Sequence, residues 1–454
     1  MSELPVVVVG AGPVGLAAAA HLLERGLEPL VLERGDRAGA AVAQWNHVRL
    51  FSSWSELIDP AAGRLLDPTG WTRPDGAGYP TGREWAESYL RPLAVALGAR
   101  VRFGAEVVGV ARRGRDRVVD SGRDDEPFSV HIRTADGAEE RVLARAVIDA
   151  SGTWTTPNPL GGEGLPAIGE RGATERISYR VPDLADAATR ARYAGKHVVV
   201  AGSGHSALTA LVALSGLAGT RISWVLRRGG VGNTFGGGDA DQLPARGALG
   251  LRAKAAVEAG LITVVTGFRA EAVERDGDGR LTLLSSAGQR LDGVDDVVVL
   301  TGFRPELGWL SEIRLELDPT LQAPVRLAPL VDPNVHSCGT VYPHGAKELA
   351  HPEQNFFLAG MKSYGRAPTF LAQTGYEQVR SIAAALAGDH EAAARVELAM
   401  AETGVCGGSG LFDEPGPEAG GCCGGEPGRL AESFPVRTAP MILASEPKGA
   451  AGGK

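Results

Sequence analysis

Two glycine-rich turns carry the clearest chemical signal in the sequence. The first turn, GAGPVG at residues 10–15, follows the apolar run at residues 6–9 and precedes a helix-prone segment. In a strand–turn–helix unit, Gly10 permits a tight turn, Gly12 lets the backbone approach a pyrophosphate, and Gly15 lets the helix pack close to the strand. The free N–H groups and the dipole at the start of the helix favour an anion. The first turn therefore predicts a dinucleotide site.

An acidic residue follows the next predicted strand. Glu33 comes directly after the apolar run at residues 30–32, where a carboxylate can accept both ribose hydroxyls of an adenosine. The residues that we predict to bind this first dinucleotide are Gly10, Gly12, Pro13, Val14, Gly15, Glu33 and Arg34.

The second turn, GSGHSA at residues 202–207, has the same context but different chemistry. Ala207 replaces the third glycine, and Arg227 and Arg228 stand at the end of the next strand, where NAD would need an acid. Two guanidinium groups suit a 2′-phosphate, which a carboxylate would repel, so we predict NADPH rather than NADH. Ordinary surface arginines are the alternative. The predicted contacts of this second dinucleotide are Gly202, Gly204, His205, Ser206, Ala207, Arg227 and Arg228.

Two dinucleotide sites on one chain indicate electron transfer between two cofactors. A flavin in the first and a nicotinamide in the second is the simple interpretation. A nucleotide sensor without catalysis would not need two complete sites.

The elements that position these turns form two βαβ units in an α/β fold. Between the turns, residues 101–110 and 128–132 suggest antiparallel strands. The apolar runs at 146–150 and 297–300 end where the chain crosses between domains, and residues 373–387 predict a late helix. From about Thr403 the chain is rich in Gly, Pro and Glu and predicts a flexible C-terminal tail.

Composition excludes several classes of protein. The chain has 454 residues, with 46 Lys and Arg against 54 Asp and Glu, so it lacks the basic footprint of a nucleic-acid-binding protein. No apolar run of about 18 residues suggests a membrane span, and the N-terminus does not resemble a signal peptide. Four cysteines are too few for a disulfide scaffold. We therefore expect a cytoplasmic protein that binds neither nucleic acid nor membrane.

Taken together, the motifs resemble those of flavin-containing monooxygenases. The resemblance rests on both turns, on Ala19 and Gly26, and on the segments at residues 150–152 (ASG) and 301–305 (TGFRP). Residues 360–381 and the cysteine-bearing tail are similar to the flavin-binding monooxygenases of actinobacterial arsenic-resistance clusters.

The resemblance implies two Rossmann-like dinucleotide-binding domains, with the NADPH domain inserted into the FAD domain. It places the FAD domain at residues 1–160 and 306–390, the NADPH domain at 161–305 and the tail at 391–454. Where related disulfide reductases carry Gly-Asp near the flavin, this chain carries Gly360-Met361. The further flavin contacts that the resemblance implies are Trp45, Arg49, Leu50, Phe51, Val107, Ala150, Gly152, Gly360 and Met361.

One fingerprint of these monooxygenases is absent. An FxGxxxH run normally precedes the second turn, but residues 173–182 read ATERISYRVP. We expect a short linker strand there.

Few other residues suggest chemistry. Asn46 is a candidate catalytic hydrogen-bonding group beside the flavin, or else a turn residue. Asp239 and Arg246 would line an NADPH channel or be solvated loop charges. Cys338 is expected to be a buried structural thiol.

Three tail cysteines could form a metal site. Cys422 and Cys423 are adjacent, and two thiolates side by side chelate a soft ion such as As(III), with Cys406 as a third sulfur. An accident of a glycine-rich tail is the alternative.

The sequence therefore predicts an NADPH-consuming, FAD-dependent monooxygenase. Its expected partners are O2 and a small soft nucleophile, with a trivalent arsenical as the leading candidate, and a homodimer is compatible with the resemblance. The alternative is a thioredoxin-reductase-like or metal-ion reductase that passes electrons to tail thiols, although no CxxC lies beside either turn.

Overall fold

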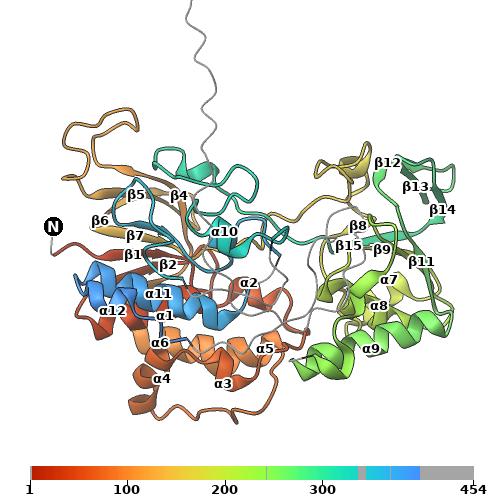
Figure 1. Cartoon of the computed structure of the whole chain (residues 1–454), viewed down its shortest axis with the longest axis horizontal. Coiled ribbons are helices and arrows are strands. Elements are labelled where there is room, and N and C mark those ends of the chain that lie inside the picture. The colour runs from red at the N-terminus through yellow and green to blue at the C-terminus, as the bar shows by residue number, and fades with distance from the viewer. Residues whose placement is uncertain (1–2, 242, 336–343, 369, 399–454) are drawn as a thin grey trace, which may run out of the picture. The chain divides into compact units, whose positions relative to one another are not determined.

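Two parallel five-stranded sheets organise the chain (Figure 1). The computed structural model describes residues 3–241, 243–335, 344–368 and 370–398. In the first sheet the strand order is β16-β7-β1-β2-β3, and all neighbouring strands run parallel. Its strands are β1 (Val6–Val9), β2 (Pro29–Leu32), β3 (Val101–Arg102), β7 (Ala146–Asp149) and β16 (Phe356–Leu358).

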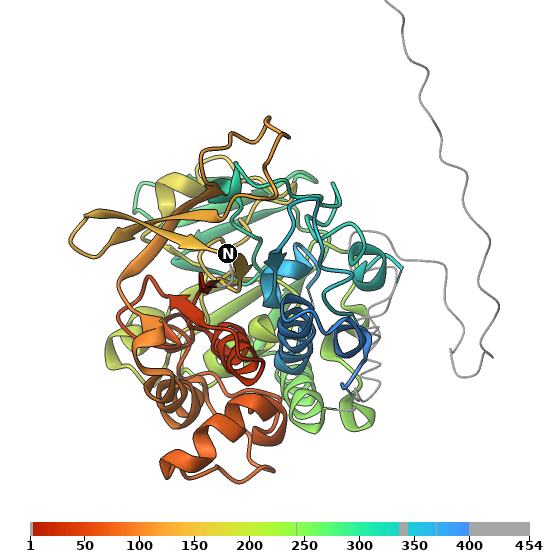
Figure 2. The same ribbon diagram turned by 90° about the vertical axis from the view of Figure 1, so that its left-hand side faces the viewer.

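The first sheet is the middle of three layers, which explains why β1 is apolar throughout. Val6 and Val8 face a helical layer, while Val7 and Val9 face a three-stranded antiparallel sheet, so no residue of the strand meets water. Figure 2 shows α1 (Pro13–Glu24) and α11 (Ala372–Leu386) side by side in the helical layer. The antiparallel sheet consists of β4 (Ala105–Arg112), β5 (Phe128–Thr134) and β6 (Glu139–Ala144).

The second sheet repeats this plan. Val198 and Val200 face helices, and Val199 and Val297 face another antiparallel sheet. The parallel strands, in the order β11-β10-β9-β15-β8, are β8 (Ile177–Ser178), β9 (His197–Ala201), β10 (Arg221–Val225), β11 (Ile262–Val265) and β15 (Asp296–Val299). The antiparallel strands are β12 (Ala270–Arg275), β13 (Leu281–Ser285) and β14 (Arg290–Val294).

The order of strands along the chain shows an insertion. The second sheet uses strands between residues 177 and 299, and the first sheet is completed only afterwards by β16. The fold is therefore two Rossmann-like domains, one inserted into the other. The domain boundaries at residues 160, 305 and 390 stay a prediction.

The remaining helices are mostly short and lie in the helical layers or the connections. They are α2 (Ala40–Ala43), α3 (Trp54–Leu57), α4 (Pro60–Leu66), α5 (Gly82–Trp85), α6 (Arg91–Leu97), α7 (Ala187–Tyr193), α8 (His205–Ser215), α9 (Pro244–Glu258), α10 (Ala328–Val331) and α12 (His390–Ala394). No helix in the described ranges is long and apolar enough to cross a membrane.

Three local predictions can be compared with the structure. The linker strand near residue 177 is confirmed as β8, which pairs with β15. The helix at 373–387 is confirmed as α11 within one residue at each end. The single antiparallel strand at 101–110 is wrong, because Gly104 adopts a φ of 63° and breaks it. The first part joins the parallel sheet as β3, and only the second part, β4, is antiparallel.

The two crossings between the sheets are bonded to each other through Asn158. Its N–H donates to the carbonyl of Gly302 at 2.9 Å, and its side-chain N–H group donates to the carbonyl of Thr301 at 2.9 Å. Its side-chain oxygen accepts from Nε of Arg304 at 2.7 Å. The outgoing and returning segments are thus one hydrogen-bonded unit.

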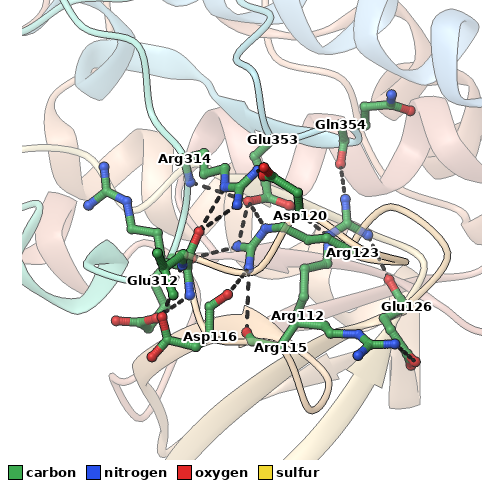
Figure 3. A network of polar contacts seen from close by, with 12 residues as sticks. Arg112, Arg115, Asp116, Asp120, Arg123, Glu126, Glu312, Arg314, Glu353 and Gln354 are labelled. Atoms are coloured by element: carbon green, nitrogen blue, oxygen red, sulfur yellow. Dashed lines mark hydrogen bonds and ion pairs between the residues drawn. The ribbon is translucent and has the colours of Figure 1, made fainter.

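A buried network of charges, here called the Glu353 clamp, fastens loops at one side of the first domain (Figure 3). The Glu353 carboxylate lies 2.7 Å from Nε of Arg112 and 2.7 Å from Nη2 of Arg123, and all three residues are about 2% exposed. The remaining donors of both arginines reach backbone carbonyls, including those of Glu126 and Gln354. Burial alone would raise the pKa of Glu353, but the hydrogen bonds that its carboxylate accepts, chiefly from Arg112 and Arg123, outweigh burial and lower the pKa.

Candidate functional site

The first turn leaves open space where an anion would lie. Gly10 has a φ of 101°, and a Cβ there would lie 2.9 Å from the carbonyl oxygen of Ala150, so only glycine fits. Gly12 precedes α1 without any side-chain cap, and a Cβ on it would meet no atom within 4 Å. Pro13 begins the helix, where its missing N–H costs nothing. The N–H groups of the first helical turn therefore face an open space.

Gly15 fulfils the packing role that its spacing predicts. A Cβ at this position would lie 1.9 Å from the carbonyl oxygen of Gly10, which no packing adjustment could absorb cheaply. The helix can approach the strand this closely only because the residue is glycine.

Glu33 is fixed by the backbone around the first turn. Its Oε2 accepts the N–H of Ala11 at 2.8 Å, and its Oε1 accepts the N–H of Gly35 at 2.7 Å. Each carboxylate oxygen keeps a further lone pair, so ribose hydroxyls can still donate to it. Arg34 is exposed beside it, and Val107 lies two residues after Ala105, whose N–H donates to the carbonyl of Glu33.

The second turn has the same backbone form. Gly202 has a φ of 128°, and a Cβ there would lie 2.3 Å from the carbonyl oxygen of Leu300. Gly204 precedes α8 without a side-chain cap and, like Gly12, has open space where a Cβ would project. Ala207 is fully buried in the place of the third glycine, and Ser206 is exposed at the start of the helix. The two turns therefore fit two dinucleotides.

Trp224 anchors the second turn, a role that the motif spacing does not predict. Its indole N–H donates to the carbonyl oxygen of Gly202 at 2.7 Å, and its ring is fully buried. The sequence does contain one indication of this role, a tryptophan inside an apolar strand, because a buried indole N–H needs an acceptor.

The two arginines after β10 differ from each other. Arg227 is exposed and forms no hydrogen bond or ion pair with the part of the chain that the structure describes. Arg228 is half-buried and donates to the hydroxyl of Thr234, and burial lowers its pKa below the ordinary value. Arg227 is thus free to meet a phosphate, whereas Arg228 already has a structural contact.

His205 stands exposed at the first position of α8. Its ring lies 5.4 Å from that of Phe51 in an edge-on contact, measured between ring centroids. Although His205 as a whole residue is exposed, the protein atoms packed near its ring desolvate it, and this desolvation, together with the positive charge of Arg246, lowers its pKa to about 4. Arg246 is itself buried and bonded through Nη2 to Asp241 at 2.7 Å, so it is neither a free channel charge nor a solvated one.

Comparisons with known proteins agree with this geometry. The family described as pyridine nucleotide-disulphide oxidoreductase matches residues 7–327, well over half of the chain. This chain belongs to that family. It is a flavoprotein oxidoreductase, and its cofactors are FAD and NADPH.

Individual relatives are more distant. The flavin-containing monooxygenase ustF1 of Aspergillus flavus is 28% identical over 211 residues, which span 45% of this chain and 48% of that protein. The solved bacillithiol disulfide reductase Bdr of Bacillus cereus has a TM-score of 0.62 at 21% identity, covering 85% of this chain and 99% of that one. A flavin-containing monooxygenase from Stenotrophomonas maltophilia has a TM-score of 0.53 at 24% identity, covering 86% and 99%. The two structures show the fold alone.

The segment from Trp45 to Phe51 of this oxidoreductase lies between the two cores. Trp45 and Leu50 pack against the core of the first domain, and Phe51 packs against that of the second. Arg49 is exposed and donates to the carbonyl of Tyr79. These residues remain predicted flavin contacts.

Asn46 lies in the turn that follows α2. Its backbone carbonyl accepts the N–H of Arg83 at 2.9 Å. The structure thus places Asn46 in a turn, and its catalytic role stays a prediction.

The first turn also meets two later segments. Ala150 and Gly152 follow β7 directly behind Gly10. Gly360, with a φ of 68°, lies against Val14, because a Cβ on it would be 3.3 Å from Cγ2 of that residue. Met361 is half-buried next to it. The structure therefore brings Ala150 and Gly360 against the first turn, and the flavin contacts of all four residues stay predictions.

The predicted cysteine sites are not among the described residues. Cys338, Cys406, Cys422 and Cys423 lie outside the described residues. Within the described ranges no cluster of His, Cys, Asp or Glu could hold a metal ion.

Proposed function

We propose that FAD binds at the first turn and NADPH at the second, and that the enzyme is a monooxygenase. The observation that carries this assignment is the difference between the two strand ends. Glu33 offers a carboxylate to a ribose diol, whereas Arg227 offers an exposed guanidinium, without an ion pair among the described residues, that suits a 2′-phosphate.

The residues of the chain bind and orient the two cofactors. The uncapped starts of α1 and α8 hold the two pyrophosphates through backbone N–H groups. Phe51 and His205 connect the flavin side with the nicotinamide side. The bound flavin supplies the transfer of two electrons from NADPH to O2.

We propose a soft nucleophile as substrate. One oxygen atom passes to an electron-rich S, Se, N or As atom, and the other is reduced to water with the electrons of NADPH. The similarity to ustF1 supports an oxygenase, and the cysteine-rich tail makes a trivalent arsenical the leading substrate.

Stopped-flow spectroscopy tests the reaction type. The enzyme is reduced with NADPH without oxygen and then mixed with O2. A monooxygenase is expected to show an oxygen-dependent absorbance transient distinct from those of reduced and oxidised flavin. Direct return to oxidised flavin, together with NADPH-dependent reduction of a disulfide, would instead establish the thioredoxin-reductase-like function.

Product analysis tests the substrate. Arsenite or a methylated trivalent arsenical should stimulate NADPH oxidation and yield a pentavalent product. Truncation after Gly404 should leave FAD binding and basal NADPH oxidation intact and weaken only this response. If arsenicals neither stimulate turnover nor yield a pentavalent product in the full-length enzyme, the substrate is wrong, while the two cofactor sites stand.

A further inference from the structure

A buried ion pair lies at the carboxyl end of β7. Nζ of Lys362 is 2.7 Å from Oδ2 of Asp149, and the two side chains are 1% and 0% exposed. The same Nζ lies 3.1 Å from Oγ of Ser151 and 4.7 Å from the ring centre of Trp309. The cation is therefore held by a carboxylate, a hydroxyl and an aromatic face.

Asp149 and Lys362 together fix how the hydroxyl of Ser151 forms hydrogen bonds. A carboxylate only accepts, so the Ser151 hydroxyl must donate to Oδ1 of Asp149, which lies 2.6 Å away. An ammonium only donates, so the same hydroxyl oxygen must accept from Lys362. The hydroxyl hydrogen of Ser151 is thus used in the bond to Asp149. One lone pair of the hydroxyl oxygen remains free to accept a further hydrogen bond.

The hydroxyl oxygen of Ser151 lies at the edge of the first sheet where a dinucleotide would bind. In the strand order β16-β7-β1-β2-β3, connections turn to opposite sides at β1 and β7, and dinucleotides bind outside the carboxyl ends of such strands. Ser151 follows β7 and is exposed, and a Cβ on Gly10 of the first turn would lie 3.1 Å from its Cα. The buried pair therefore lies directly behind the edge of the first turn.

We propose that Lys362 and Asp149 are positioning residues that act on the flavin cofactor through Ser151. They fix the Ser151 hydroxyl as a hydrogen-bond acceptor, which receives a hydroxyl or N–H donor of bound FAD and not a phosphate oxygen. This inference rests on the proposed placement of FAD at the first turn. Under this inference, Lys362 provides a polar group for flavin binding directly after Met361, the position at which related disulfide reductases carry an acid.

The Glu353 clamp shows what a purely structural pair looks like in the same domain. The donors of its arginines reach the carboxylate and backbone carbonyls, and the group presents no atom at an exposed position. The Lys362–Asp149 pair differs because its third member, Ser151, is exposed beside the first turn.

The first test removes the exposed hydroxyl alone. Ser151→Ala should raise the dissociation constant for FAD roughly fivefold to tenfold, as expected for one lost hydrogen bond, while Ser151→Thr should retain wild-type affinity. FAD is titrated into the apoprotein and followed by quenching of its fluorescence. Ser285→Ala, which removes a hydroxyl from β13 in the antiparallel sheet of the second domain, serves as the matched control and should have no effect.

The second test is a double-mutant cycle. Lys362→Met should also weaken FAD binding at least fivefold, but in the Ser151→Ala background it should cause no further loss, because its effect passes through the hydroxyl. Additive losses, or unchanged FAD affinity in Ser151→Ala, would overturn the inference. If Lys362→Met does not fold, the comparison of Ser151→Ala with Ser151→Thr decides alone.

Failure of the underlying FAD placement is recognised separately. Gly12→Val would then keep its flavin. If Gly12→Val loses FAD while Ser151→Ala binds it normally, only the role of Ser151 is wrong.

Discussion

The first and second turns follow strands of the same kind, but opposite chemistry anchors them. At the first turn, the carboxylate of Glu33 accepts the N–H of Ala11. At the second turn, the indole of Trp224 donates to the carbonyl of Gly202. The first turn is thus held by a negatively charged acceptor, and the second turn by a neutral donor.

Strand register explains why the discriminating residues are not at equivalent positions. Val9 pairs with Leu32, and Ala201 pairs with Val225, so the position of Glu33 corresponds to Leu226. Leu226 is 2% exposed and can neither attract nor repel a ribose substituent. We therefore expect the proposed charge discrimination at the second site to begin one residue later, at Arg227.

The largest expected difference between the two turns is in the effect of replacing Gly12 or Gly204 by valine, which fills the open space at each turn. Gly12→Val should give a folded protein without FAD, because a Cβ there would meet no protein atom within 4 Å, while the new side chain would occupy the proposed place of the pyrophosphate. Gly204→Val should keep its yellow colour yet fail to be reduced by NADPH. Flavin absorbance and anaerobic NADPH titration measure both. A yellow Gly12→Val protein would show that FAD binds elsewhere.

A smaller effect is expected at the strand end of the second site. Replacing Arg227 and Arg228 by Ala should raise the KM for NADPH at least tenfold and that for NADH much less, since a charge-assisted pair contributes about 1.5–3 kcal/mol. Arg227→Ala alone should affect only NADPH, whereas Arg228→Ala should also disturb the loop at Thr234 and affect both nucleotides. Equal changes for NADPH and NADH in Arg227→Ala would contradict phosphate recognition.

The anchor of the second turn should act on both nucleotides alike. Trp224→Phe retains an aromatic ring but leaves the carbonyl of Gly202 without its donor, which costs about 1 kcal/mol. The KM values for NADPH and NADH should therefore rise together, by roughly fivefold. Trp71→Phe is the matched control, because it removes an indole N–H from the carbonyl of Ser88 in the first domain. A change specific to NADPH would mean that Trp224 does not act through the backbone.

The smallest expected effect concerns pH. The pyrophosphate of the nucleotide should raise the pKa of His205 from about 4, so binding takes up a proton and tightens as pH falls towards the free-protein value. The 2′-phosphate titrates in the same range, so wild type is compared with His205→Gln. Between pH 7.5 and 5, the affinity of wild type for NADP+ relative to the variant should rise by roughly threefold. Parallel pH profiles would exclude His205 from the pyrophosphate site.

The sequence was sufficient for features that depend on local spacing. The apolar runs of β1 and β9, the turns behind them and Glu33 follow from the pattern of neighbouring residues, and the structure contains all of them. The second apolar run ending at residue 300 also appears, as β15.

Features formed between distant segments could not be predicted in this way. Arg112 and Glu353 are 241 residues apart, and Lys362 and Ser151 are 211 apart, so no local period reports their contact. The sequence contains one indication of the second contact: Asp149 is a charged residue at the end of a buried strand, and such a group needs a partner. The antiparallel strand at residue 101 was mispredicted because a two-residue strand has no pattern of its own.

The late arrival of β16 determines the order in which the chain can fold. Leu358 pairs with Asp149, roughly 200 residues earlier, and α11 follows still later. During synthesis the inserted domain can complete its sheet once residue 299 has emerged, while the first domain still lacks an edge strand and one helix of its core. The unfinished domain then exposes the edge of β7 and the apolar face of α1. We therefore expect the nascent chain to be most prone to aggregation after β15 has emerged and before β16 has emerged.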